Sequence, residues 1–264
     1  MKLLETVKFV EQKTSLKPKI GIILGSGLGT FAENFSQKNI LNTSEIPNYP
    51  KSNVEGHGGK IIFGKIKNIP ILAFQGRVHY YESGILENVL FPIYFAKEIG
   101  IKTLIITNAS GGINNFFSPG DLMLINDHIN LTFLNPIQNL EKKNFQKKSY
   151  DENLKKIAET SAIKLKIKLQ KGTYIGVTGP SYETASEIQM FKKIGADAVG
   201  MSTVNEVILA VNLGIKVLGI SCITNLATGI SSKKLSHKEV TETGNKVKHQ
   251  FEKLITKIIE TINV

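Results

Sequence analysis

The sequence has few of the residues that build disulfide frameworks, zinc clusters or membrane spans. Cys222 is its only cysteine, which excludes an internal disulfide and a cysteine-rich zinc site and suits a reducing compartment. No stretch approaches the roughly 20 consecutive apolar residues that cross a bilayer. Residues 1–13 are amphipathic and charged, unlike the unbroken apolar core of a secretory signal. We therefore expect a soluble, cytoplasmic protein with no membrane partner.

Arginine is as rare as cysteine, although the chain is basic. Lysine and arginine total 33 against 22 acidic residues, the formal net charge is +11, and Arg77 is the only arginine. A basic domain is the usual electrostatic footprint of a nucleic-acid-binding protein. Here, however, the lysines are scattered and are not interleaved with aromatic residues. We expect solvated surface charge and no nucleic-acid partner, and keep a basic nucleic-acid-binding protein as an alternative.

The composition and the apolar pattern predict an α/β fold. With 41% hydrophobic and 21% charged residues, the chain has a globular composition and forms a single domain over residues 1–264. Short Ile- and Val-rich runs predict buried strands. These runs cover residues 19–24, 60–66, 69–74, 103–107, 121–125, 173–177, 197–200 and 217–223. Helical patterns between them indicate a central mixed sheet flanked by helices, with ligands expected at the carboxyl ends of strands.

Helix starts are marked by capping boxes, in which Ser or Thr precedes Glu by three residues. We interpret three such pairs as helix starts: Thr184 with Glu187, Thr203 with Glu206, and Ser236 with Glu239. They predict helices over residues 187–194 and 203–212 and a C-terminal helix. In the last of these, an apolar stripe is formed by Phe251, Leu254, Ile255, Ile258 and Ile262.

Two glycine-rich turns are predicted to follow strands, at residues 25–29 and 107–112. Backbone N–H groups in such turns, with the Ser26 hydroxyl in the first, can hold an anion. The first turn is neither a Walker A loop nor a full dinucleotide fingerprint. It leaves open a dinucleotide-dependent oxidoreductase or a turn built only for close packing.

The lone arginine lies in a segment dense in polar groups. Residues 75–82 place Arg77, His79, an aromatic hydroxyl and a carboxylate at the end of another predicted strand. A guanidinium grips an oxyanion at two points, which lysine cannot reproduce. We interpret Arg77 as an anion-binding residue, with a structural Arg–carboxylate pair as the alternative. Ser202, before a helix start, adds a hydroxyl suited to the same role.

A further group of residues suits a heterocyclic ligand. Tyr182 and Glu183 place an aromatic ring beside a carboxylate at a helix start, and Asn225 ends the last predicted strand. The ring can stack on a heterocycle, while the carboxylate and the amide bind its polar edge. Glu183 has the alternative role of complementing the helix dipole. From the residues alone, the ligand is an anion plus a heterocycle.

In this order, eight segments resemble the trimeric purine nucleoside phosphorylases over residues 19–240. The segments are GSGLG, GHGG, QGRVHYYE, TNASGG, GDLMLINDHINL, GPSYET, GADAVGMSTVNEV and ITN. The resemblance implies a phosphate site at Ser26, His57, Arg77, His79, Ala109 and Ser202. It implies a ribose site at Tyr81, Met201 and His237. It also implies a base site at Tyr182, Glu183 and Asn225, with Asn225, Glu183 and His79 taking part in catalysis.

The implied reaction is phosphorolysis of inosine and guanosine to a free purine and ribose or deoxyribose 1-phosphate. Phosphate is the co-substrate, and no cofactor or metal is implied. Alternatives within the family are a xanthosine-accepting enzyme and a methylthioadenosine phosphorylase. The implied assembly is a homotrimer, in which Phe145 is the candidate for the ring that reaches a neighbouring pocket. Two departures are a shorter segment at residues 135–151 and a tyrosine, Tyr182, where phenylalanine is usual.

Overall fold

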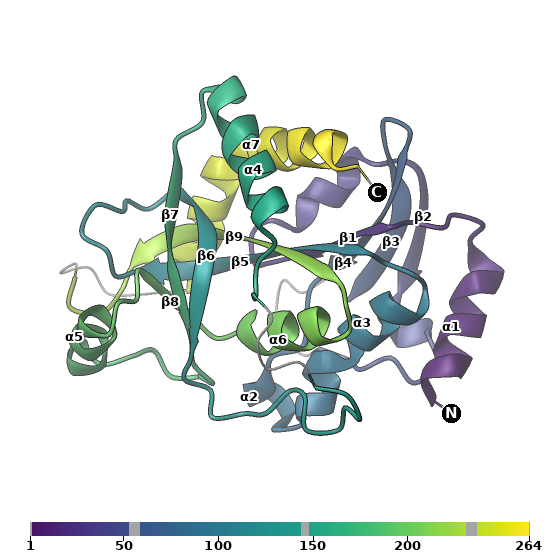
Figure 1. Cartoon of the computed structure of the whole chain (residues 1–264), viewed down its shortest axis with the longest axis horizontal. Helices are drawn as coiled ribbons and strands as arrows, with labels where there is room; N and C mark the ends of the chain where they lie inside the picture. Colours follow the sequence, from purple (N-terminus) through teal and green to yellow (C-terminus); the bar gives the residue numbers. More distant parts are fainter. Residues whose placement is uncertain (1, 53–58, 144–147, 231–236, 264) are drawn as a thin grey trace.

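A nine-stranded mixed sheet organises the computed structural model, which describes residues 2–52, 59–143, 148–230 and 237–263 (Figure 1). The strands are β1 (Ile20–Leu24), β2 (Ser36–Asn42), β3 (Lys60–Ile66), β4 (Ile69–Gln75), β5 (Thr103–Gly112), β6 (Leu122–Asn130), β7 (Leu169–Gly176), β8 (Ala198–Gly200) and β9 (Lys216–Leu226). The helices are α1 (Lys2–Lys13), α2 (Tyr80–Ser83), α3 (Leu86–Glu98), α4 (Glu152–Leu165), α5 (Ala185–Lys193), α6 (Val204–Asn212) and α7 (His237–Thr261). Two short 3₁₀ turns are η1 (Gly29–Asn34) and η2 (Thr43–Glu45). Among the described residues, no helix has the length and apolarity needed to cross a membrane.

Five of the strands close into a ring. The sheet order is β2-β3-β4-β1-β5-β8-β7-β6-β9, and β9 pairs again with β5 in parallel. The pairs β5–β8 and β6–β9 are antiparallel, while β6–β7 and β7–β8 are parallel. This mixture confirms the predicted mixed sheet. The closure brings β5, β8 and β9 together, although they are far apart in sequence.

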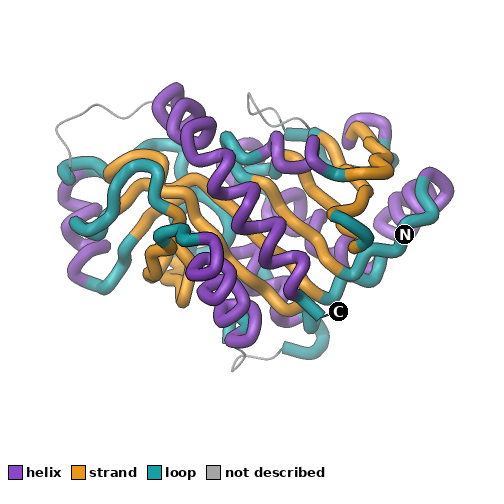
Figure 2. The backbone as a smooth tube through the Cα atoms, turned by 90° about the horizontal axis from the view of Figure 1, so that it is seen from above, coloured by secondary structure: helices purple, strands orange, loops and turns teal. Residues whose placement is uncertain are grey.

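Helices cover both faces of the sheet, which explains the continuous apolar strands. In Figure 1, α4 and α7 lie above the strands and α3 and α6 below them, and Figure 2 looks down on helices that cross the strands. All five residues of β1 are buried, as expected for a strand covered on both faces. The predicted apolar stripe of α7 is buried as well, and each such side chain contributes roughly 1.5–3 kcal/mol relative to exposure.

Most of the predicted elements are confirmed, and two differences have physical causes. The predicted glycine turn at residues 107–112 is wrong, because β5 continues as a strand through Gly112 with a register shift after Ser110. Strand β2 was not predicted because none of its side chains is buried, so it carries no apolar run.

The capping boxes are confirmed for two helices. Thr184 is the N-cap of α5 and Thr203 the N-cap of α6, each paired with the Glu three residues later. Helix α7 begins at His237, close to the predicted start. Ser236, the predicted cap of that helix, lies outside the described residues.

Candidate active site

One cavity of about 280 Å³ lies where strands β1, β4, β5, β7, β8 and β9 give way to the segments that follow them. The predicted anion-binding residues in its lining are Ser26, Arg77, His79, Ala109 and Ser202. The predicted sugar- and base-binding residues in its lining are Tyr81, Met201, Tyr182, Glu183 and Asn225. The fold thus gathers ten positions from segments that are distant in the sequence.

For three of the candidate site residues, the structure does not describe the side chain. His57 and Phe145 lie outside the described residues. His237 is the first residue of α7, and its side chain also lies outside what is described.

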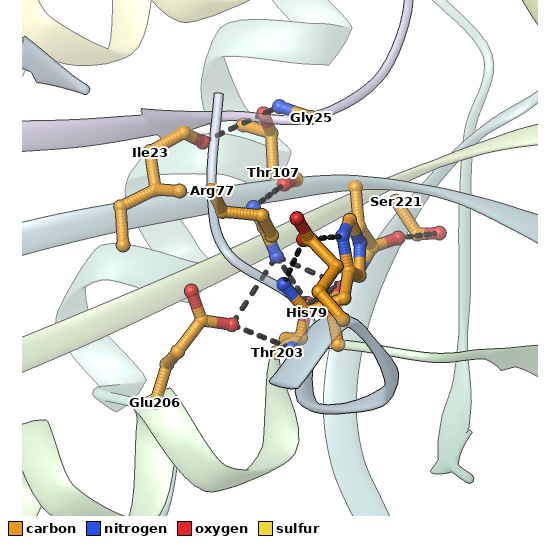
Figure 3. A network of polar contacts seen from close by, with 11 residues as sticks. Ile23, Gly25, Arg77, His79, Thr107, Thr203, Glu206 and Ser221 are labelled. Carbon is orange, nitrogen blue, oxygen red and sulfur yellow. Dashed lines mark hydrogen bonds and ion pairs between the residues drawn. The ribbon is translucent and has the colours of Figure 1, made fainter. Parts of the chain in front are cut away.

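Arg77 is buried, and its guanidinium is held by several partners (Figure 3). Nη1 donates to Ser202 Oγ at 2.9 Å, to Thr203 Oγ1 at 3.3 Å and to Glu206 Oε2 at 3.2 Å. Nη2 donates to the carbonyl oxygen of Thr107. Arg77 therefore forms the buried pair with a carboxylate, and it also lines the cavity; its role in anion binding stays a prediction.

The first glycine turn is held against β5 by backbone contact. A Cβ on Gly25 would lie 2.6 Å from the Cα of Asn108 and 2.9 Å from the carbonyl oxygen of Thr107. The Gly25 N–H donates to Thr107 Oγ1 at 3.1 Å, and that hydroxyl donates to the carbonyl of Ile23 at 2.9 Å. Only glycine fits this approach, which sets Ser26 at the edge of the cavity.

His79 and Tyr81 are oriented by the short helix α2. The His79 backbone N–H donates to Glu82 Oε1 at 2.6 Å, and its Nδ1 lies 3.5 Å from the same oxygen. The rings of His79 and Tyr81 stack at 5.0 Å between centroids with a 15° interplanar angle. A second bond to the carboxylate of Glu82 comes from the Ser52 hydroxyl at 3.0 Å. Both rings therefore face the cavity from one rigid turn.

Polar side chains also line the part of the cavity predicted to bind a base. Thr224 Oγ1 donates to Asn225 Oδ1 at 3.0 Å, and Asn225 Nδ2 donates to the carbonyl of Leu226 at 3.2 Å. An amide nitrogen carries two N–H donors, and the bond to Leu226 uses one of those of Asn225. The second N–H is a further donor at this end of the cavity. Burial raises the pKa of the Glu183 carboxyl above its ordinary value. Tyr182 is 48% exposed, as suits a ring at a cavity mouth.

Gly179 shapes this region. Gly179 precedes a cis bond to Pro180 and has φ +66°. A Cβ there would lie 2.4 Å from the sulfur of Met201 and 3.1 Å from a ring carbon of Tyr81. The loop that carries Tyr182 therefore approaches the predicted sugar-binding residues so closely that no side chain fits between them.

With this geometry in place, comparisons with known proteins identify the family. Residues 19–260 match the model of the phosphorylase superfamily. The chain belongs to this superfamily. It is 46% identical to purine nucleoside phosphorylase 1 of Bacillus subtilis over 95% of each chain, and 38% identical to the mouse purine nucleoside phosphorylase over 97% of this chain and 93% of the mouse protein.

Solved structures in the superfamily share the fold. A crystal structure of schistosome purine nucleoside phosphorylase with hypoxanthine matches with a TM-score of 0.90 and 32% identity, covering 99% of this chain and 97% of that one. A Schistosoma mansoni purine nucleoside phosphorylase with adenosine also matches at a TM-score of 0.90, with 33% identity. The predicted fold class is therefore confirmed.

The cavity lining and its surroundings contain buried polar residues that sequence reasoning missed. Asn108 Nδ2 donates to Thr203 Oγ1 at 2.8 Å, and Asn108 Oδ1 accepts from the Ser221 hydroxyl at 2.6 Å. Ser110 Oγ lies 2.6 Å from Ser221 Oγ. Asn108 and Ser110 belong to the TNASGG segment, so the available signal was a cluster of polar residues after an apolar run. Glu206 was noticed only as a helix cap.

Chemically, the cavity offers cationic and hydroxyl donors together with a carboxylate, an amide and an aromatic ring. Such a set has the chemistry to bind an oxyanion and a polar heterocycle at once. Among the described residues, no group of three or more His, Cys, Asp or Glu side chains is arranged to hold a metal ion.

Proposed function

We propose that this member of the phosphorylase superfamily catalyses the reversible phosphorolysis of purine nucleosides. The products are a free purine base and ribose 1-phosphate or its deoxy form. One observation carries the proposal: anion-binding residues around Arg77 and base-binding residues around Asn225 line the same cavity. The relatives named above support it, because they are purine nucleoside phosphorylases and match this chain over nearly their whole length.

Phosphate is bound at the end of the cavity that holds the lone arginine. Arg77, His79 and Ser202 present side-chain donors, Ser26 adds a hydroxyl, and Ala109 adds a backbone N–H. Donors aimed at fixed positions stabilise a dianion without rearranging as it reacts. His57 completes this set in the proposal.

The sugar lies between the phosphate and the base, against Tyr81, Met201 and His237. The glycosidic C–N bond breaks first, and the sugar gains oxocarbenium character beside the anionic phosphate. Phosphate then attacks the anomeric carbon from the opposite side, so the configuration inverts. No covalent enzyme intermediate, metal or cofactor takes part in the proposed reaction.

The leaving purine accumulates negative charge, which the base-binding residues stabilise. The amide of Asn225 binds N7 and O6, and the carboxylate of Glu183 accepts from N1–H and from the 2-amino group of guanine. These contacts strengthen as charge develops, so they lower the barrier. Tyr182 stacks against the ring.

Proton positions make the site selective for 6-oxopurines. Adenine presents a lone pair at N1, where Glu183 requires a donor, and an amino group where O6 is expected. A site built on buried polar partners rejects such a mismatch by roughly 10⁴–10⁵. Inosine and guanosine are therefore the proposed substrates.

The proposed assembly is a homotrimer. This follows from the resemblance to trimeric enzymes, and an exposed aromatic residue supports it. Phe133 is 90% exposed in the segment after β6. Its neighbours Thr132 and Leu134 line a small hollow that His79 and Met201 also line. A neighbouring subunit that covered this apolar ring would remove its surface from water, which favours association.

A cytoplasmic location is also part of the proposal. Cys222 is a free, buried thiol in β9. Burial raises the pKa of this thiol to about 12, so the thiol stays protonated and unreactive at neutral pH. A free thiol of this kind suits a reducing compartment.

The deciding experiment is product analysis with the purified protein. Inosine, guanosine, adenosine and xanthosine are each incubated with and without phosphate, and base and sugar products are separated by chromatography. We expect hypoxanthine or guanine with an equal amount of pentose 1-phosphate, and only when phosphate is present. Release of free ribose without phosphate would contradict phosphorolysis, and comparable turnover of adenosine would contradict the proposed base selectivity.

A further inference from the structure

We propose that Glu206 is a positioning residue for phosphate binding. It holds Arg77 and the turn at Thr203 in the geometry that presents Ser202 to the anion. This inference rests on the proposed function, because it concerns the phosphate end of the same cavity. It assigns a role to a buried carboxylate that makes no contact with the cavity itself.

The turn before α6 has an unusual backbone. Thr203 has φ +76° and ψ −54°, a region that β-branched residues avoid. The N–H of Val204 donates to the carbonyl of Ser202 at 2.8 Å, which closes a γ-turn around Thr203. Strain of this kind persists only where the surroundings fix it, and it is typical of functional sites.

One oxygen of Glu206 fixes both the turn and the arginine. Oε2 accepts from the Thr203 backbone N–H at 2.6 Å and from Arg77 Nη1 at 3.2 Å. The side chains of Arg77 and Glu206 are only 4% and 3% exposed, so water does not compete for these bonds. The carboxylate therefore ties the strained turn to the guanidinium, as Figure 3 shows.

The same arrangement sets the direction of the Ser202 hydroxyl. Thr203 Oγ1 accepts from Asn108 Nδ2 at 2.8 Å and from Arg77 Nη1 at 3.3 Å, and in the capping box also from the Glu206 backbone N–H, so its acceptor positions are occupied. Its own hydrogen then points to Ser202 Oγ, 3.2 Å away. Because Ser202 Oγ also accepts from Arg77 at 2.9 Å, its own hydrogen is left to donate, either to the neighbouring Tyr174 hydroxyl or, when phosphate is bound, to the anion.

The rival explanation is that Glu206 serves only as a helix cap. Helix α5 offers a matched comparison, because Glu187 accepts from the Thr184 backbone N–H at 2.7 Å in the same capping box. Glu187 is exposed and is not part of the cavity lining. Glu206, by contrast, is buried and bonded to Arg77. Removing each carboxylate separates the capping role from the positioning role.

The test compares Glu206→Ala, Glu206→Gln and Glu187→Ala in steady-state kinetics, varying phosphate and inosine separately. Orthophosphate binding without nucleoside is measured by calorimetry. For Glu206→Ala we expect the phosphate KM and Kd to rise roughly 10- to 100-fold, as for loss of hydrogen bonds to a charged group, while the inosine KM stays within about twofold. Glu206→Gln keeps an oxygen for both bonds, so its phosphate constants stay within about threefold of wild type. Glu187→Ala leaves the phosphate constants unchanged.

If Glu206→Ala does not fold, Glu206→Asp replaces it. This variant keeps the charge but is one methylene shorter, so positioning predicts weaker phosphate binding than in Glu206→Gln. The inference would be overturned if Glu206→Ala changed the KM values for phosphate and inosine equally, or left phosphate binding unchanged. It would also be overturned if Glu206→Gln bound phosphate as weakly as Glu206→Ala or Glu206→Asp. Wild-type protein that binds phosphate but releases no base would contradict the proposed function, and the calorimetric comparison would still test Glu206.

Discussion

Asn225 presents an amide of fixed orientation, because Thr224 bonds to its oxygen and Leu226 to its nitrogen. Asn225→Asp replaces the donor with a carboxylate, which accepts from a 6-amino group and repels O6. We expect kcat/KM for inosine to fall about 10²–10³-fold, as for loss of one transition-state donor, and the ratio of adenosine to inosine turnover to rise. Steady-state kinetics with both nucleosides measure this ratio. The exposed Asn153 on α4 provides the control Asn153→Asp, and an unchanged ratio in Asn225→Asp would contradict the assigned role.

Glu183 links activity to pH because burial raises the pKa of its carboxyl. The folded protein favours the protonated form, so the stability this group contributes below its unfolded pKa is lost as pH rises through its folded pKa. Glu183→Gln is therefore expected to raise Tm at pH 7, with a smaller gain as pH falls towards 4.5, while turnover of inosine decreases. The wild-type rate falls on the acid side where Glu183 becomes protonated.

Glu187 provides a control, because the pKa of its carboxyl is shifted in the opposite direction to that of Glu183. Hydrogen bonds from the Thr184 backbone and hydroxyl lower the pKa of its carboxyl, so its contribution to stability is present above its unfolded pKa and is lost as pH falls through its folded pKa. We expect Glu187→Gln to lower Tm at pH 7 and to lose this effect in acid. Thermal unfolding of both variants over a pH series measures these shifts. The same sign for the two variants would show that burial does not govern Glu183.

At the scale of elements, apolar runs predicted most strands because both faces of the sheet are covered. Apolar runs do not mark the part of a strand that lines the cavity. Strand β5 continues beyond Thr107 with the buried polar residues Asn108 and Ser110, whose hydrogen bonds reach β9 through Ser221. A sequence pattern alone cannot show that these polar groups find hydrogen-bond partners across a closed ring. The strand is therefore predicted to end at Thr107, whereas it ends at Gly112.

The glycines of the first turn differ in what they contact, and this difference can be tested. A Cβ on Gly25 meets backbone atoms of β5 at 2.6 Å, whereas one on Gly29 meets the flexible end of Gln75 at 3.2 Å. Gly25→Ala must push the turn away from β5, so we expect it to destabilise the fold by about 1–3 kcal/mol and to raise the phosphate KM. Gly29→Ala should change both much less. Denaturant unfolding and phosphate titration measure the pair, and equal effects would contradict a backbone limit at Gly25.

At the scale of the whole molecule, the sequence predicted candidate binding residues but not how they meet. Ser26, Arg77 and Ser202 lie far apart along the chain, yet they line one cavity. The pairings of β4 with β1, β1 with β5 and β5 with β8 bring the strands that precede them together, and such long-range pairing leaves no local signal. Resemblance to a family supplied this information. The pairing of Glu206 with Arg77 could not be predicted, because a capping box already accounts for a glutamate at this position.

Assembly is the remaining property at this scale. A homotrimer would have about three times the 29.1 kDa mass of the chain, and the exposed Phe133 beside the site is the apolar contact that supports it. We expect Phe133→Asp to shift the mass measured by light scattering towards the monomer and to lower activity at dilute protein, because a buried charge opposes association.

Ile163 offers the matched control. It is 76% exposed on α4, and Figure 1 places α4 on the opposite side of the sheet from α3 and α6. Ile163→Asp should leave both the mass and the activity unchanged. A wild-type mass equal to one chain across micromolar concentrations would refute the trimer. An unaltered trimer in Phe133→Asp would instead show that subunits meet elsewhere, because a carboxylate sealed between subunits without a partner would weaken the assembly.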